Sequence, residues 1–170
     1  MNIVLCGMMG AGKTTVGIQL ALLLDRSWVD TDNLIVKDYG EISKIFEHHG
    51  EEYFRDLETR VVEEVVEEDR LIISVGGGLV MREENVSLLK ENGKIFYLRA
   101  SAETLAQRLK GDTTRPLLKT GDRDLKENLA KKLEERAPVY EKVADFIIDV
   151  EGKNPGQIAV DIVSMMQEIK

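Results

Sequence analysis

The glycine-rich turn near the start of the chain constrains the fold more than any other feature. An apolar run at residues 3–6 leads straight into Gly7, and the pattern G-x-x-x-x-G-K-[ST] is completed by Gly12, Lys13 and Thr14. Glycines in such a turn allow backbone conformations that a Cβ would forbid, so successive N–H groups converge at the positive end of the following helix. The pattern predicts a strand, a phosphate-binding loop (P-loop) and a helix.

The side chains and amides of this loop have distinct expected roles. Lys13 should reach the β- and γ-phosphates of a nucleotide, and the hydroxyl of Thr14 should hold Mg²⁺. An amphipathic pattern at residues 16–24 favours this interpretation over a strand–turn–helix corner that contains the motif by chance. The positions expected to bind the nucleotide here are Gly10, Ala11, Gly12, Lys13, Thr14 and Thr15.

Length, charge and cysteine content narrow the class of protein. With 170 residues and a net charge of −8, the chain has the size of one domain, 1–170, and does not attract nucleic acid electrostatically. It has no apolar run of about 18 residues that would span a membrane. Cys6 has no cysteine partner, and the first expected strand begins at Asn2, which leaves no room for a signal peptide. We therefore expect a cytoplasmic monomer that binds neither nucleic acid nor membrane.

Short apolar runs alternate with helical patterns along the whole chain. Such alternation predicts a parallel sheet covered by helices on both faces, which is a three-layer α/β fold. The five apolar runs lie at residues 3–6, 28–30, 71–75, 95–98 and 146–150. The helical patterns lie at residues 16–24, 41–49, 51–68, 83–91, 102–110 and 125–143, with a last helix that Pro155 opens.

One stretch, residues 111–121, has no periodic apolar pattern. It is polar, begins and ends with glycine, and contains Arg115. A loop of this length in a compact domain is more often functional than decorative. We expect a mobile lid that closes Arg115 over bound phosphates, with an ordinary surface loop as the alternative.

Two carboxylates, Asp30 and Asp32, follow the second apolar run. Ligands of parallel α/β sheets bind at the carboxyl ends of the strands, so both side chains are expected near the phosphate loop. One can hold Mg²⁺ through water, and the other can accept a proton from an attacking hydroxyl. The alternative is that one of them only caps a helix that starts near Asn33.

Three consecutive glycines, Gly76, Gly77 and Gly78, follow the third apolar run. They let the backbone approach a ligand closely, although a tight turn without a ligand is the alternative. Many P-loop proteins end this strand with an aspartate that orders the metal, whereas this chain has Ser74 and then valine. Asp30 is therefore the nearest candidate for a second metal-ordering carboxylate.

Two arginines are candidates for binding an anionic substrate. Arg136 shares its helical stripe with Leu129, Leu133 and Tyr140, and an inward arginine needs an anion, since an unpaired buried charge is costly. That anion is either an internal glutamate or a substrate carboxylate. Arg55 has glutamates at i−4 and i+3, so a surface salt bridge is its simplest interpretation.

Taken together, these motifs closely resemble those of the shikimate kinase family. The P-loop alone is shared by a very large superfamily, but the whole set is far more specific and follows the same order along nearly the entire chain. The set comprises Gly7…Lys13-Thr14, Asp30-x-Asp32, Glu51-x-x-Phe54-Arg55, Gly76-Gly77-Gly78, Arg115-Pro116-Leu117-Leu118 and Arg136. The resemblance implies the strand order 2-3-1-4-5 and a shikimate-binding helical segment at about residues 31–60.

The resemblance also implies a role for each motif. It places Mg²⁺ at Thr14 with Asp30 close by, and it assigns catalysis to Lys13, Asp32 and Arg115. Nucleotide contacts are implied for Arg108, Arg115 and Lys153, although family members vary at the position of Lys153. The residues implied to bind shikimate are Asp32, Arg55, Gly76, Gly77, Gly78 and Arg136.

The implied reaction belongs to aromatic amino acid biosynthesis and transfers the γ-phosphoryl group of ATP to the 3-hydroxyl of shikimate. Two guanidinium forks suit the substrate carboxylate, and Asp32 acts as a base or as a positioning group. The alternatives are a kinase for another small hydroxylated acid such as gluconate, a nucleoside monophosphate kinase, a GTPase, and a non-catalytic nucleotide-binding relative. The last should have lost Lys13 or Asp32, and a GTPase should carry Asn-Lys-x-Asp, which the sequence lacks.

Overall fold

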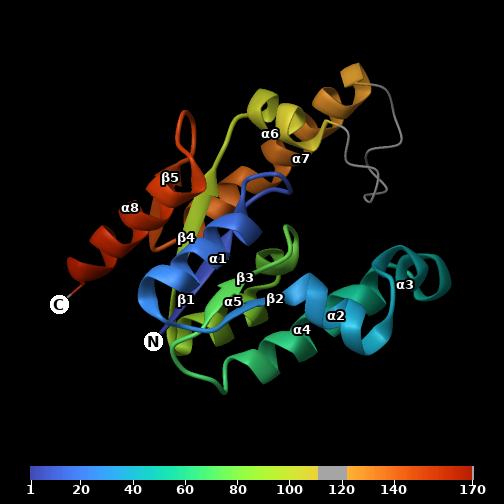
Figure 1. The fold of residues 1–170 in the computed structure, drawn as a ribbon. Coiled ribbons are helices and arrows are strands. Elements are labelled where there is room, and N and C mark those ends of the chain that lie inside the picture. The colour runs from blue at the N-terminus through green and yellow to red at the C-terminus, as the bar shows by residue number, and fades with distance from the viewer. Residues whose placement is uncertain (111–121, 170) are drawn as a thin grey trace.

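The structure is a computed structural model that describes residues 1–110 and 122–169. The predicted lid at 111–121, with Arg115, lies outside the described residues. The fold consists of a central sheet with helices on both faces (Figure 1), as the alternating sequence pattern predicts.

The sheet has five parallel strands in the order β2-β3-β1-β4-β5. This confirms the predicted strand order, with the strand that leads into the phosphate loop at the centre. All five residues of that strand are buried, as expected for a central strand covered on both faces. The strands are β1 (Asn2–Cys6), β2 (Trp28–Asp30), β3 (Ile72–Ser74), β4 (Gly93–Arg99) and β5 (Phe146–Asp149).

The helices form the two outer layers and an extension beside β2. α1 packs with α8 on one face, α5 and α7 pack against β4 on the other, and α2 and α3 extend away from the sheet beside α4 (Figure 1). The helical elements are α1 (Lys13–Leu24), α2 (Thr31–Tyr39), α3 (Ile42–His49), α4 (Glu51–Val65), the 3₁₀ turn η1 (Leu79–Met81), α5 (Glu83–Glu91), α6 (Ala102–Leu109), α7 (Asp122–Val143) and α8 (Pro155–Gln167).

Local sequence signals explain where several of these helices begin. Ser101 caps α6 through the backbone N–H of Thr104, and Asn154 with Gln157 forms a capping box on α8. Gly50, at φ 84°, separates α3 from α4, as predicted. The main addition is α2, which begins directly after β2 because Asp30 caps it by accepting a hydrogen bond from the backbone N–H of Asn33.

The core lies between the sheet and the two helical layers. It includes Cys6, which is fully buried, and burial raises the pKa of its thiol to about 12. A thiol with so high a pKa stays protonated and unreactive at neutral pH, as expected for a core cysteine. Within the described residues, every helix is too short or too polar to cross a membrane.

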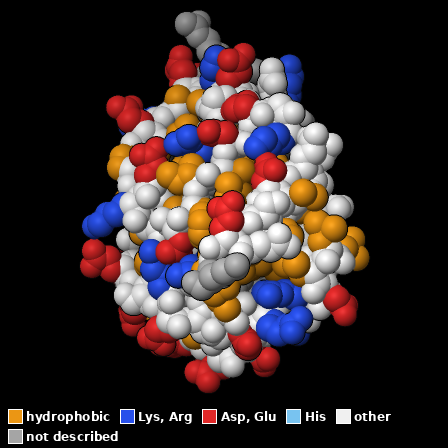
Figure 2. Space-filling view, turned by 90° about the vertical axis from the view of Figure 1, so that its left-hand side faces the viewer, with side chains coloured by type: hydrophobic (Ala, Val, Ile, Leu, Met, Phe, Trp, Pro, Cys, Tyr) orange, Lys and Arg blue, Asp and Glu red, His pale blue; other side chains and the backbone are white. Residues whose placement is uncertain are grey.

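The surface on the α8 side of the molecule is mixed in character. Figure 2 shows acidic and basic side chains interspersed over this face, with hydrophobic side chains between them. Exposed apolar residues of α1 and α8 include Leu22, which is 74% exposed, and Val160. Among the described residues that this view shows, basic side chains are therefore separated by acidic and apolar ones.

Candidate active site

The phosphate loop leads from the end of β1 into the first turn of α1. Gly7 has φ 143°, and a Cβ on it would lie 2.7 Å from the backbone oxygen of Leu98. Only glycine fits this combination of backbone conformation and close approach. Gly12, at φ 100°, forms the N-terminal boundary of α1. The loop N–H groups next to this boundary lie at the positive end of the helix.

Two cations lie against the backbone of the loop. Lys13 Nζ donates hydrogen bonds to the oxygens of Gly7, at 2.5 Å, and Met8, at 3.1 Å. Arg108, from the last turn of α6, donates through Nη1 to the oxygens of Ala11, at 3.0 Å, and Gly10, at 3.4 Å. The structure therefore brings Arg108 to the phosphate loop, although 97 residues separate it from Ala11.

A cavity of about 430 Å³ opens beside the loop and the start of α1. Its volume lies within the range of small-molecule sites. Its lining residues are Met8, Met9, Gly10, Gly12, Lys13, Thr14, Thr15, Val16, Arg108, Leu109, Pro155 and Ile158. Most of the predicted nucleotide-binding positions thus share one cavity, and the start of α8 closes one side of it.

Lys153 is the predicted nucleotide contact that the structure supports least. Its Nζ forms an ion pair with Asp161 at 2.7 Å. Pro155 and Ile158 line the cavity from this part of the chain. The first turn of α8 therefore lines the cavity, whereas Lys153 is not one of its lining residues.

Thr14 and Asp30 form a pair of oxygen ligands beside the loop. Thr14 Oγ1 donates to Asp30 Oδ2 at 3.2 Å, while Asp30 Oδ1 accepts from the N–H of Asn33 at 3.1 Å. Asp30 is thus both a helix cap and a neighbour of Thr14, so the capping interpretation and the metal interpretation are compatible. No group of three or more His, Cys, Asp or Glu residues that would enclose a metal occurs within 1–110 or 122–169. Two hard oxygens without such a cage fit Mg²⁺, which binds through few protein ligands together with phosphates and water.

The three consecutive glycines form a surface that predicted substrate-binding residues contact. A Cβ on Gly77 would lie 3.0 Å from Arg136 Nη1, and a Cβ on Gly78 would lie 2.5 Å from Arg55 Nη1. Side chains at these two positions would displace both guanidinium groups. The structure therefore brings the two arginines, from α7 and α4, to adjacent positions on one turn.

Asp32 lies over the first glycine of the same turn. A Cβ on Gly76 would lie 2.8 Å from Asp32 Oδ1 and 3.0 Å from Glu58 Oε2. Thr31 is fully buried, and its Oγ1 accepts a hydrogen bond from the N–H of Gly76 at 3.0 Å. This bond ties the start of α2 to the glycine turn and thereby fixes the position of Asp32.

Glu58 is a site residue that the sequence interpretation missed. Its side chain is only 1% exposed, and its Oε1 accepts a hydrogen bond from Arg55 Nη1 at 2.6 Å. The expected surface salt bridge of Arg55 therefore exists with the exposed Glu51. The ion pair with Glu58 is buried instead, so that part of the expectation is wrong. The available signal was its position on the apolar stripe of α4, four residues after Phe54 and four before Val62.

The electrostatics around Glu58 are unusual for a carboxylate. Its Oε2 is buried without a hydrogen-bond partner within the described residues. Burial raises the pKa of Glu58, and Asp32 raises it further, whereas the charges of Arg55 and Arg136 lower it. The acceptor side of the site therefore contains two carboxylates and two guanidinium groups that influence one another.

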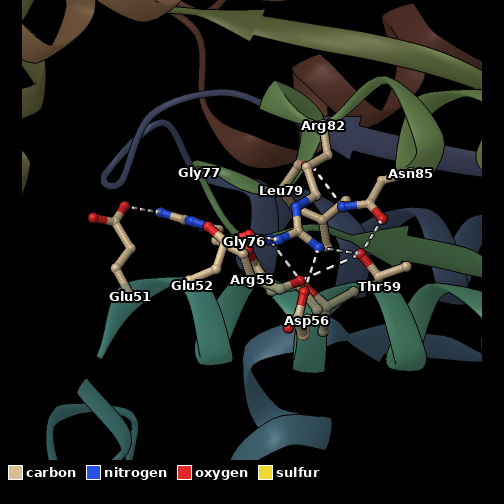
Figure 3. A network of polar contacts seen from close by, with 12 residues as sticks. Glu51, Glu52, Arg55, Asp56, Thr59, Gly76, Gly77, Leu79, Arg82 and Asn85 are labelled. Atoms are coloured by element: carbon tan, nitrogen blue, oxygen red, sulfur yellow. Dashed lines mark hydrogen bonds and ion pairs between the residues drawn. The ribbon is translucent and has the colours of Figure 1, made fainter. Parts of the chain in front are cut away.

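A polar network ties the glycine turn to α4 (Figure 3). Arg82 donates to Glu52 at 2.6 Å and to Asp56 at 2.9 Å. Asn85 accepts from Thr59 Oγ1 at 2.8 Å and donates to the oxygen of Leu79 at 2.9 Å. Arg55 belongs to the same helix, so this network holds it in register with the turn.

Tyr140 holds the glycine turn from the side of α7. It is fully buried, and its hydroxyl donates to the backbone oxygen of Gly77. Burial raises the pKa of this phenol, which therefore remains a donor at neutral pH. Arg136 lies one helical turn before Tyr140, so the same anchor positions its guanidinium.

Comparison with known proteins gives a consistent result along the chain. A family model described as shikimate kinase matches residues 9–167. A shikimate kinase from Caldicellulosiruptor bescii is 48% identical over 165 residues, which cover 96% of this chain and 94% of that protein. The structure of a shikimate kinase from Acinetobacter baumannii in complex with shikimate has a TM-score of 0.93 and 37% identity, and covers 99% of this chain and 94% of that one.

A more distant neighbour concerns one of the alternatives from the sequence. A gluconokinase from Sinorhizobium meliloti has a TM-score of 0.65 at 18% identity, covering 99% of this chain and 92% of that one. At this level of identity the likeness shows a shared fold alone.

Proposed function

This chain belongs to the shikimate kinase family, and we propose that the residues described above transfer the γ-phosphoryl group of ATP to the 3-hydroxyl of shikimate. The products are shikimate 3-phosphate and ADP. The observation that carries this assignment is the glycine turn on which Asp32, Arg55 and Arg136 converge. The phosphate loop lies at the same edge of the sheet, where β1, β2 and β3 end.

The phosphate loop supplies the site for ATP in this proposal. Its N–H groups donate hydrogen bonds to the phosphates at the N-terminus of α1, and Lys13 Nζ exchanges the oxygens of Gly7 and Met8 for phosphate oxygens. Arg108 holds the loop backbone and adds positive charge beside the cavity. These charges stabilise the negative charge that develops on the transferred group.

Thr14 and Asp30 are the residues that would hold Mg²⁺, Asp30 through a water molecule. When bound, the ion neutralises charge on the β- and γ-phosphates. Without the ion, Thr14 donates a hydrogen bond to Asp30, and Asp30 also caps α2.

Shikimate has a carboxylate and three hydroxyls, and the acceptor side offers matching groups. Arg55 and Arg136 clamp the carboxylate, since planar guanidinium forks bind a carboxylate through two parallel hydrogen bonds. Asp32 and the backbone of Gly77 hold the hydroxyls. The glycine turn lets the ring approach the backbone where any side chain would block it.

The transfer step follows from this placement. The 3-hydroxyl oxygen attacks the γ-phosphorus in line, a new P–O bond forms, and the bond to the leaving ADP oxygen breaks. Asp32 accepts the hydroxyl proton, or, in a loose transition state, mainly aims the oxygen at phosphorus. The resemblance adds Arg115 on the phosphates and a lid at 111–121, and both remain part of this proposal.

Further parts of the proposal concern the domain, its assembly and its location. We propose a single catalytic domain, with residues of about 31–60 as the shikimate-binding segment, acting as a cytoplasmic monomer. The single cysteine is a buried thiol, which fits a reducing compartment. Sedimentation with and without both substrates would test the monomer.

The decisive experiment measures ADP release from ATP against a panel of acceptors. Shikimate should support turnover, while quinate, gluconate and nucleoside monophosphates should support little. Turnover with gluconate that matches turnover with shikimate would contradict shikimate as the specific acceptor and favour the alternative, a kinase for another hydroxylated acid. Nucleotide binding without turnover on any acceptor would favour a non-catalytic relative.

A further inference from the structure

The hydroxyl of Ser74 links two neighbouring groups at the carboxyl end of β3. It accepts a hydrogen bond from Trp28 Nε1 at 3.0 Å and donates one to the backbone oxygen of Lys13 at 2.7 Å. Ser74 is fully buried, and its single proton is committed to Lys13. This chain of contacts, the Trp28–Ser74–Lys13 relay, joins β2 and β3 to the phosphate loop.

The second turn of α1 also packs directly on this relay. A Cβ on Gly17 would lie 2.4 Å from Trp28 Nε1 and 2.7 Å from Ser74 Oγ, so only glycine allows the helix to come this close. Lys13 is thus fixed twice: through its own carbonyl, and through the packing of Gly17 one turn later. The start of α1 can shift little relative to the sheet.

β2 therefore holds the loop at two points. Trp28 and Asp30 are two residues apart and lie on the same side of the strand. Trp28 reaches the Lys13 backbone through Ser74, and Asp30 contacts the Thr14 hydroxyl directly. The two adjacent loop residues with the most demanding roles are both braced by this strand.

We propose that Trp28 and Ser74 are positioning residues for the phosphate loop. They hold the Lys13 backbone so that the loop N–H groups and the Lys13 side chain are oriented before ATP binds. Donors fixed in advance need no reorganisation during binding and reaction. Ser74 occupies the strand end where many P-loop proteins carry a metal-ordering aspartate, and this chain uses the position to brace the loop. The inference rests on the proposed role of the loop as the ATP phosphate site.

A spectroscopic consequence follows, because Trp28 is the only tryptophan of the chain. Its indole N–H is one end of the relay, and Lys13 is the other. Bound ADP places negative charge beside Lys13 and so changes the electric field at the indole, while the hydrogen bonds of the relay stay in place. Trp28 emission should therefore respond to ADP with Mg²⁺ and remain unchanged with shikimate alone.

Kinetics of three variants would test the positioning role. Ser74→Ala removes both hydrogen bonds of the relay, and Trp28→Phe removes the one between Trp28 and Ser74. Ile73→Val removes one buried methyl group from the adjacent residue as a matched control. We expect Trp28→Phe to raise the KM for ATP and the Kd for ADP about two- to tenfold, as for one neutral hydrogen bond, and Ser74→Ala to raise them at least as much. The KM for shikimate should stay within about twofold of the parent. The control should leave both KM values unchanged.

Several results would overturn the inference. Equal increases in the two KM values would indicate a general structural role, and so would an increase in the control that matches Ser74→Ala. An ADP affinity that stays unchanged in a folded Ser74→Ala variant would refute the positioning role. So would Trp28 emission of the parent protein that responds to shikimate and does not respond to ADP. If Ser74→Ala does not fold, Trp28→Phe and the titration of the parent protein decide. Lys13→Ala separates this inference from the proposed function. If Lys13→Ala loses turnover while Ser74→Ala and Trp28→Phe bind ADP normally, only the positioning role is refuted.

Discussion

The two sides of the site are built in opposite ways. The phosphate loop is one continuous stretch that ends one strand and begins one helix. The acceptor side gathers Asp32, Arg55 and Arg136 from three separate helices around one glycine turn. The glycine backbone and the helix start form the donors of the first, which Ser74 and Arg108 then brace, whereas tertiary packing must place each group of the second. A local substitution should therefore damage the nucleotide side, while the acceptor side should also be sensitive to residues that touch no substrate.

The two sides differ in their charges as well. On the nucleotide side, cations lie against backbone oxygens that a phosphate can replace. On the acceptor side, a buried carboxylate, Glu58, already accompanies Arg55. In the proposed function, shikimate enters a region whose charges are partly paired beforehand.

The largest expected effect belongs to Lys13→Ala. Its ammonium acts on charge that develops during transfer, so turnover should fall about 10²- to 10³-fold, the scale for one lost transition-state donor. Shikimate affinity should stay near the parent value, because the acceptor groups come from other elements. Steady-state kinetics with a shikimate titration would measure both, and the exposed Lys37→Ala serves as the control. Turnover within about threefold of the parent would show that the loop is not catalytic.

Arg136→Ala should have the next largest effect, confined to the acceptor side. Truncating one member of a desolvated charge pair costs about 2–5 kcal/mol, and half-buried Arg136 belongs at the lower end, about 30-fold in shikimate affinity. Affinity for ATP should change little. Calorimetric titration with each substrate would test this, with Arg60→Ala on the exposed side of α4 as the control. A lower melting temperature with unchanged shikimate affinity would make Arg136 a structural ion-pair member instead.

Glu58→Gln should act through Arg55 and weaken shikimate binding about tenfold, as for one charge-assisted hydrogen bond. Stability offers a second readout. Burial raises the pKa of Glu58, so the folded state holds its proton more tightly and loses stability as pH rises from the unfolded pKa through the folded one. Denaturant unfolding between about pH 4 and 8 should show the variant gaining stability relative to the parent as pH rises. Parallel pH profiles would show that Glu58 keeps an ordinary pKa.

The smallest effect is expected for Arg82→Ala, which breaks the network between the glycine turn and α4. Its partners Glu52 and Asp56 are well exposed, and exposed ion pairs contribute about 0–1 kcal/mol each. Shikimate KM should rise no more than about threefold, and ATP KM should not change. A tenfold rise would mean that the register of α4 against the turn controls the acceptor side far more strongly. Glu91→Ala, on the exposed end of α5, is a suitable control.

The sequence predicted the fold well because the decisive signals are local. The five apolar runs, the glycine at 50 between two helices, the cap at Ser101 and the proline that opens α8 all depend on neighbouring residues only. The strand order rested on family resemblance, and the structure confirms it. Element ends shifted by a few residues, as α4 shows by ending at Val65, because packing against other elements decides where a helix frays.

The candidate site divides along the same line. The sequence by itself determined the phosphate loop, since glycine φ angles and a helix start create the donor arrangement within one continuous stretch. Only the tertiary structure decided that Glu58 is buried against Arg55, that Ser74 braces Lys13, and that Arg108 reaches the loop. Those contacts join residues on different elements, or turn one face of a helix toward the core. Residue spacing along the chain gives a signal for the burial of Glu58 on the apolar stripe of α4, but none for the long-range contacts of Ser74 and Arg108.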